Sequence, residues 1–102
     1  MKQTLSKIGT DIRFEEQCLK VLEHFEAILP DTFFNKGRSY YACIIWIASN
    51  VYLRRDITQA LISERTGFSN NKIWRQTKAI LAVIGLTSVK EVRGKKLDKI
   101  GG

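Results

Sequence analysis

The chain has 102 residues and carries 17 Lys and Arg against 10 Asp and Glu, a formal net charge of +7. This length fits one domain with a single hydrophobic core. Its two cysteines, Cys18 and Cys43, stand singly in apolar stretches, which argues against a disulfide framework or a zinc site and favours small buried residues. The longest apolar run, residues 40–48, is far shorter than the roughly 20 residues that span a bilayer.

The positive charge is concentrated toward the C-terminal end. From Arg65 onward, nine Lys and Arg residues accompany two acidic residues, Glu91 and Asp98. Such an excess favours a polyanion, either nucleic acid or an anionic membrane surface. Because the charge coincides with a predicted DNA-docking motif, we expect double-stranded DNA as the partner and no membrane partner. The first residues form no hydrophobic signal region, so we expect a cytoplasmic protein, or a nuclear one in a eukaryote.

The first long predicted helix covers residues 11–29, with Thr10 or Asp11 as its N-terminal cap. Its apolar residues recur at helical spacing and define one buried face: Phe14, Cys18, Val21, Leu22, Phe25 and Leu29. Pro30 ends the helix, and the two phenylalanines of the connector that follows are expected to pack back onto the core. His24 lies beside the apolar face without a second ligand or nucleophile, so we interpret it as a boundary residue.

The next predicted helix, residues 39–53, is apolar nearly all the way round in its first two turns. A helix of this kind is normally surrounded by other helices. The sequence therefore predicts an all-α bundle in which this helix is central and at least four others lie around it.

Residues 58–84 predict a helix-turn-helix, by which small proteins present one helix to the DNA major groove. A short helix capped by Thr58 precedes a left-handed turn at Gly67, and Ser69 caps the longer second helix. The expected buried stripe of the second helix is Ile73, Thr77, Ile80, Leu81 and Ile84.

The opposite side of this second helix carries the candidate DNA contacts. Lys72 and Arg75 are one turn apart, so they can reach the same groove or run of phosphates. Asn pairs well with adenine, and Lys or Arg with guanine, which makes Asn70 and Asn71 further candidate base readers. A tryptophan at the spacing of Trp74 is more often packed at a seam between helices than in contact with a base or a protein.

Residues 87–102, which follow the domain of residues 1–86, allow two interpretations. Apolar residues spaced among charged ones can form a β-hairpin that turns at residues 93–95, the wing of a winged helix. The basic residues at its tip would lie near DNA phosphates: Arg93, Lys95 and Lys96. The other interpretation is a frayed basic tail, because four apolar residues only weakly offset the entropy of ordering sixteen.

Four short blocks carry a family resemblance: Ile47-Ala48-Ser49, Thr58-Gln59, Gly67-Phe68-Ser69 and Ile84-Gly85-Leu86. In this order they resemble the cyclin-box repeat of archaeal transcription factor B and eukaryotic transcription factor IIB. Residues 5–22 resemble the short first helix of that repeat and the start of its second, so the resemblance covers residues 5–86. It implies the five-helix cyclin fold, whose last two helices bind promoter DNA. The DNA contacts that it implies are Ser69, Asn70, Asn71, Lys72, Trp74, Arg75 and Lys78.

The sequence therefore predicts a DNA-binding protein that acts in transcription or its regulation. One alternative is a dimeric winged-helix repressor or plasmid centromere-binding protein, which requires a real hairpin and self-association. Another is a cyclin-like module that binds a protein, such as one of the transcription machinery. The chain has one histidine, no glycine-rich phosphate loop, no metal-ligand cluster and no nucleophile paired with a base. We therefore expect no enzymatic activity, cofactor, metal or small-molecule substrate.

Overall fold

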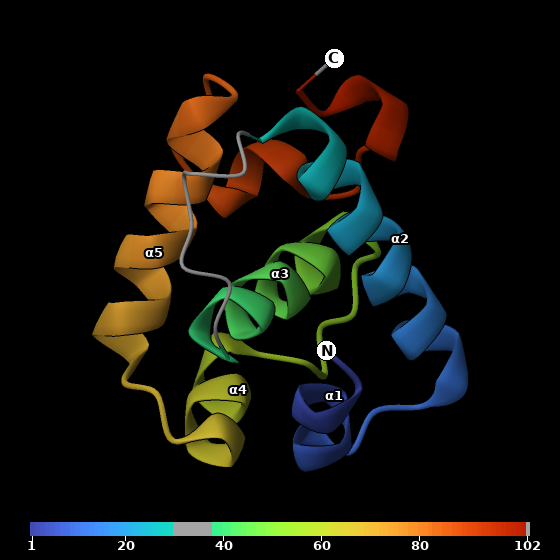
Figure 1. The fold of residues 1–102 in the computed structure, drawn as a ribbon, viewed down its shortest axis with the longest axis vertical. Coiled ribbons are helices and arrows are strands. Elements are labelled where there is room, and N and C mark those ends of the chain that lie inside the picture. The colour runs from blue at the N-terminus through green and yellow to red at the C-terminus, as the bar shows by residue number, and fades with distance from the viewer. Residues whose placement is uncertain (30–37, 102) are drawn as a thin grey trace.

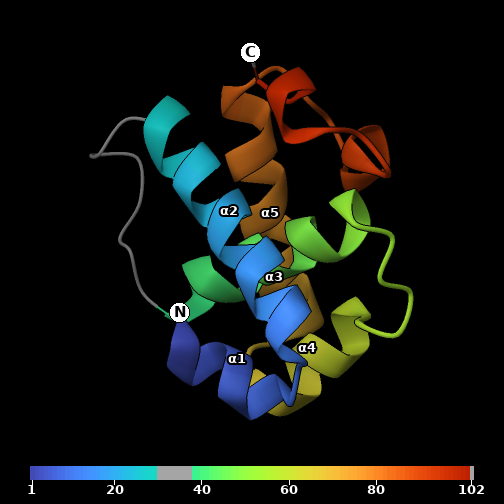
Figure 2. The same ribbon diagram turned by 90° about the vertical axis from the view of Figure 1, so that its right-hand side faces the viewer.

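A central helix, α3, organises the computed structural model, which describes residues 1–29 and 38–101. The elements in chain order are α1 (Lys2–Ile8), α2 (Ile12–Ile28), α3 (Arg38–Val51), α4 (Gln59–Thr66), α5 (Asn70–Val83), η2 (Val89–Val92) and η3 (Leu97–Lys99). Helices α2 and α5 flank α3, while α1 and α4 pack together at one end of the bundle (Figures 1 and 2). The last two elements are short 3₁₀ helices. Within the described residues the fold is all-helical, without a strand.

The position of α3 follows from its apolar surface. Its fully buried hydrophobic residues are Tyr40, Ala42, Cys43, Ile44, Ile45, Ile47 and Ala48. They occupy all sides of the helix because α1, α2, α4, α5 and η2 all contact it. The prediction of a central helix with four other helices around it is confirmed.

The start of α2 is fixed by Asp11, one of the two predicted caps. Its Oδ1 accepts a hydrogen bond from the Phe14 N–H at 2.7 Å. Its Oδ2 lies 2.9 Å from Arg54 Nη2, which is also 2.9 Å from Asp56 Oδ2. The bond from Phe14, and then the guanidinium, lower the pKa of Asp11 below its ordinary value. Arg54 thereby ties the start of α2 to the loop that follows α3.

The two cysteines are buried and unpaired, as predicted. Burial raises the pKa of the Cys18 thiol to about 12 and that of Cys43 to about 11. Both side chains therefore act as small hydrophobic residues of the core. The predicted packing of the two phenylalanines after Pro30 lies outside the described residues.

The C-terminal segment forms neither a hairpin nor a frayed tail, so both interpretations are wrong for residues 87–101. Val92 is 0% exposed and Ile100 is 1% exposed, because both side chains enter the core. The residues that were expected to alternate in a strand are three apart: Val89 with Val92, and Leu97 with Ile100. A spacing of three matches the turn of a 3₁₀ helix, whereas a strand requires a spacing of two.

His24 connects this segment to α2. Its Nε2 donates to the carbonyl oxygen of Ile100 at 2.6 Å. The side chain is half-buried, as expected of a residue at the edge of the apolar face. The bond holds the C-terminal segment against the last turns of α2.

Candidate nucleic-acid interface

The turn between α4 and α5 has the geometry that the sequence predicts. Thr58 Oγ1 accepts the Leu61 N–H at 3.1 Å, and Ser69 Oγ accepts the Lys72 N–H at 3.1 Å. Gly67 ends α4 with φ of +82°, a left-handed conformation that residues with a Cβ resist. Each helix is therefore capped at its N-terminus, and the turn between them depends on a glycine.

Two side-chain hydrogen bonds fix the first turn of α5 relative to α4. Ser63 Oγ donates to the Phe68 carbonyl oxygen at 2.5 Å, and Gln59 Nε2 donates to that of Asn70 at 2.7 Å. Both donors lie on α4, and both acceptors lie on the backbone at or just before α5. A helix held in this way would lose less conformational entropy on binding any ligand.

One stripe of α5 fixes the rotation of the helix. Its buried residues are Ile73, Thr77, Ile80 and Leu81, and the predicted Ile84 is half-buried. Cys43 Sγ of α3 donates to the Ile73 carbonyl oxygen at 3.6 Å, so the two helices are in direct contact. The opposite side of α5 must therefore face outward.

The structure brings most of the predicted DNA contacts together on this outward side. The exposed residues of the set are Asn70, Asn71, Lys72, Trp74, Arg75 and Lys78. Helix α5 contains no acidic residue. The described residues show no ion pair to Lys72, Arg75 or Lys78, so no acidic side chain there competes with an external anion for them. Ser69 is also exposed, but its hydroxyl already serves as the helix cap.

Trp74 is not packed at a seam between helices, so that expectation is wrong. Its side chain is 50% exposed, and Lys78 Nζ lies 4.5 Å from the centre of its ring. The physical reason is that the space beside it is open. A groove of about 290 Å³ lies beside it, lined by residues of α3, α4, α5 and the segment after α5.

This groove contains two residues that the sequence did not single out. Trp46 and Lys90 line it beside the predicted Trp74 and Lys78, so both tryptophans of the chain lie there. Trp46 was grouped with the apolar residues of α3, although tryptophan is large and rarely fully buried, and its indole N–H needs a partner where it is buried. That property is the one sequence signal that can distinguish Trp46 from its neighbours.

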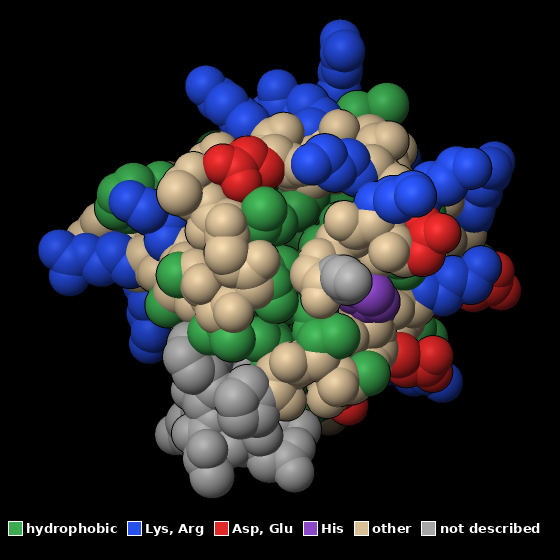
Figure 3. All heavy atoms as spheres, turned by 90° about the horizontal axis from the view of Figure 1, so that it is seen from above, with side chains coloured by type: hydrophobic (Ala, Val, Ile, Leu, Met, Phe, Trp, Pro, Cys, Tyr) green, Lys and Arg blue, Asp and Glu red, His purple; other side chains and the backbone are tan. Residues whose placement is uncertain are grey.

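The basic residues of the predicted hairpin tip lie elsewhere. Arg93, Lys95 and Lys96 are exposed, but the segment that carries them lies at the C-terminal end of α3, where the Gly94 N–H donates to the Asn50 carbonyl oxygen at 3.1 Å. In Figure 1 this segment lies away from the α4–α5 turn. Arg93 is directed to α3, where its Nη2 and Nε donate to Asn50 Oδ1 at 3.3 and 3.4 Å. Figure 3 views this end of the molecule and shows Lys and Arg side chains projecting around its edge. The structure thus separates these residues from Lys72.

No protein-family model, curated protein or solved structure matches this chain. None of the described helices is both long and apolar enough to cross a membrane. In the same part of the chain, no three His, Cys, Asp or Glu side chains are placed to hold a metal ion. The features that bear on function are therefore the geometry and charge of α4, α5 and the surface around them.

Proposed function

We propose that the protein binds double-stranded DNA through the exposed side of α5 and acts in transcription or its regulation. One observation carries this proposal: Lys72, Arg75 and Lys78 share one exposed helix face without an acidic partner among the described residues. The helix that presents them is capped, bonded to α4 and packed on α3. A rigid helix with cations on its outer side fits the requirements of a major-groove reader.

In this proposal the α4–α5 pair acts as a helix-turn-helix, with α5 as the recognition helix. The 14 residues of α5 give a rod about 21 Å long, narrow enough for the major groove. Residues near the start of a recognition helix contact base edges, a role that suits Asn70 and Asn71. Lys72, Arg75 and Lys78 would supply affinity through phosphates or guanine.

The resemblance to the cyclin-box repeat of archaeal transcription factor B supports the same assignment. That family uses the last two helices of a repeat on promoter DNA, and the matching blocks of this chain lie in α3, α4 and α5 and at their ends. A single helix-turn-helix binds weakly, so we propose that the protein acts as a homodimer or beside a protein of the transcription machinery.

The test is the salt dependence of duplex binding by the double variant Lys72→Ala/Arg75→Ala. Each lost phosphate contact lowers the slope of log K against log salt by about 0.9, so the slope should fall by about two and the affinity at least tenfold. Thermal unfolding should change little, because both side chains are exposed.

The matched control is Arg13→Ala/Lys20→Ala, which removes the same charge from the exposed side of α2. It should leave duplex binding close to that of the unchanged protein. Equal affinities for the two double variants would refute the assignment of α5.

A second candidate function is protein binding in the groove beside α5. The observation that favours it is the presence of Trp46 and Trp74 in one groove, because tryptophan is enriched where protein interfaces concentrate their binding energy. If this function is correct, the protein should bind a polymerase or regulator, and Trp74→Ala should abolish that binding. The unchanged protein should then show no measurable affinity for duplex DNA.

A further inference from the structure

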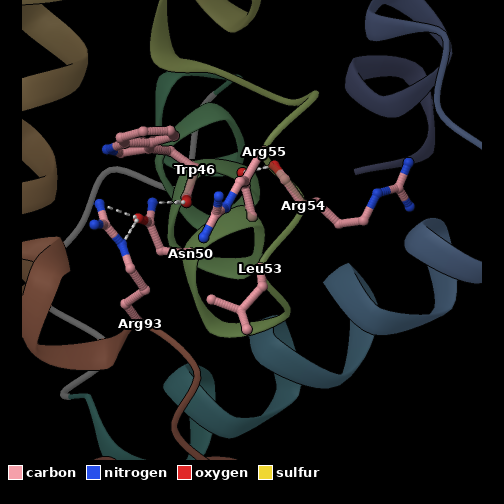
Figure 4. Close-up of a pocket in the computed structure, with 7 residues that line it drawn as sticks. Trp46, Asn50, Leu53, Arg54, Arg55 and Arg93 are labelled. Carbon is pink, nitrogen blue, oxygen red and sulfur yellow. Dashed lines mark hydrogen bonds between the residues drawn. The ribbon is translucent and has the colours of Figure 1, made fainter.

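A second pocket, of about 250 Å³, lies at the C-terminal end of α3 (Figure 4). Three arginines from two distant parts of the chain line it: Arg54, Arg55 and Arg93. Asn50 and Trp46 contribute its polar and aromatic walls. Three positively charged guanidinium groups around one pocket repel one another unless an acidic side chain or an anion balances them.

Arg54 is neutralised within the protein. Its guanidinium hydrogen-bonds Asp56 at 2.9 and 3.0 Å and lies 2.9 Å from Asp11. In Figure 4 its side chain extends away from Asn50. The charge of this arginine is thus already balanced, and it serves the fold.

Arg55 and Arg93 have no such balance. Their guanidinium groups flank the Asn50 side chain from two sides (Figure 4), and neither forms an ion pair in the part of the chain that the structure describes. Arg93 Nη2 and Nε donate to Asn50 Oδ1 at 3.3 and 3.4 Å. Asn50 Nδ2 donates to the Trp46 carbonyl oxygen at 2.9 Å, which fixes the orientation of the amide. The amide thereby orients the Arg93 guanidinium, and Nη1 of this group has no hydrogen bond within the described residues.

The backbone around Asn50 joins the two segments that carry these arginines. The Asn50 carbonyl oxygen accepts the Gly94 N–H at 3.1 Å and the Leu53 N–H at 3.3 Å. Leu53 has φ of +55°, a left-handed conformation that is uncommon for such a residue. Gly94 lies against the Leu53 side chain, since a Cβ added to Gly94 would be 3.7 Å from the Leu53 methyl groups. Packing and bonding at the end of α3 therefore hold Arg55 and Arg93 near each other.

We propose that Arg55 and Arg93, oriented by Asn50, bind a phosphate group. A guanidinium presents its donors in a planar fork that matches phosphate oxygens, and two unbalanced guanidinium groups favour an anion over any neutral ligand.

The source of the phosphate follows from the position of Trp46. This residue lines both the phosphate pocket and the groove that contains Lys78 and Lys90, so the site continues the basic surface beside α5. We assign the phosphate to the DNA backbone, an assignment that rests on the proposed function. The affinity of the pocket for phosphate does not depend on it.

The experiment compares Arg55→Gln with Arg13→Gln, which removes the same charge from α2. Arg55 and Arg13 are both exposed, and neither side chain has a bond within the described residues, so both variants should fold. One arm measures the rise in melting temperature with inorganic phosphate in a chloride buffer. The other measures duplex affinity against salt concentration.

In the first arm, Arg55→Gln should abolish the rise caused by phosphate. In the second, it should lower the salt slope by about one and weaken duplex binding severalfold. Arg13→Gln should change neither. An effect in both arms supports a site for backbone phosphate, and an effect in the first arm alone supports a site for free phosphate.

Equal behaviour of the two variants in both arms overturns the proposal. If the unchanged protein does not bind duplex DNA, the proposed function is wrong. The melting temperatures of the first arm still test whether the pocket binds phosphate. Asn50→Asp provides a second variant, because it keeps an acceptor for Arg93 and adds a negative charge between the arginines. It should lose the phosphate effect as fully as Arg55→Gln does.

Discussion

Helices α2 and α5 pack against α3 in the same way but face solvent with opposite charge patterns. Each buries four residues in a single stripe: Phe14, Cys18, Val21 and Phe25 on α2, and Ile73, Thr77, Ile80 and Leu81 on α5. Outside the stripe, α2 mixes two basic residues with four glutamates, whereas α5 has three basic residues and no acidic one. Equivalent roles in the core therefore leave the exposed residues free to serve different purposes.

The helix dipole makes the contrast sharper. The N-terminal end of a helix favours an acidic side chain, and α2 places Glu15 there. Helix α5 places Lys72 in its first turn instead, against the dipole. Asp11 and Glu15 thus stabilise the start of α2, whereas Lys72 adds positive charge at the end of α5 where unpaired backbone N–H groups already do so. This is the arrangement expected of a helix that serves an anionic ligand.

The largest expected effect is on the free energy of unfolding, through the hydrophobic core to which both helices contribute. Ile100 is 1% exposed, and a Cβ on the next residue, Gly101, would lie 2.7 Å from Ile28 of α2 and 3.1 Å from Ile84 after α5. Ile100→Ala should therefore lower the free energy of unfolding by about 2–5 kcal/mol, as measured by urea denaturation. Duplex binding at temperatures where the variant is folded should not change.

Lys99→Ala is the control, because this side chain is exposed in the same turn and should cost less than about 0.5 kcal/mol. Equal stabilities for the two variants would show that the C-terminal segment is not part of the core. A loss of DNA binding by folded Ile100→Ala would contradict the inference that core packing and ligand binding depend on different residues.

The parts of the fold that the sequence predicts are those with local signals. Helices α2 to α5 follow from apolar spacing, and the caps Asp11, Thr58 and Ser69 and the turn at Gly67 follow from residue type. Helix α1 was expected only from the family resemblance, since seven residues are too few for a clear periodic pattern. Once the buried stripe of α5 is predicted, the residues on its exposed side can be predicted from helical geometry.

The parts that the sequence did not predict depend on contacts between distant residues. Arg93 and Asn50 are 43 positions apart, and no local pattern relates them. The groove that Trp46 and Trp74 line likewise brings together residues of α3 and α5 that are distant in the sequence. In the C-terminal segment, four apolar residues fold against an existing core, so their spacing of three matters more than their number.

The next effect compares the caps of the two helices. Ser69→Ala should lower stability by about 1 kcal/mol, with the same cost at pH 7 and near pH 2, because a hydroxyl cap does not titrate. Asp11 does titrate, and its pKa in the folded state is lower than the ordinary value of 3.8. Its contribution is therefore present above the unfolded value and is lost as the pH falls through the folded value.

Asp11→Ala should accordingly destabilise the protein at pH 7 and have a smaller effect near pH 2, below both pKa values. Urea denaturation at the two pH values tests both caps with one method. A cost of Asp11→Ala that does not vary with pH would mean that the carboxylate charge contributes nothing to the start of α2.

The smallest expected effect tests the charge contrast itself. Lys72→Glu places an acid at the third position after Ser69, which completes a capping box and satisfies the dipole of α5. The variant should gain about 0.5 kcal/mol of stability and lose duplex affinity, whereas Glu15→Lys should lose stability and leave affinity unchanged. A less stable Lys72→Glu would show instead that the Lys72 ammonium, 5.2 Å from the Phe68 ring centre, stabilises the turn more than the dipole opposes it. Opposite changes in stability and affinity at the same position would establish that α5 carries its charge for a ligand at the expense of its own stability.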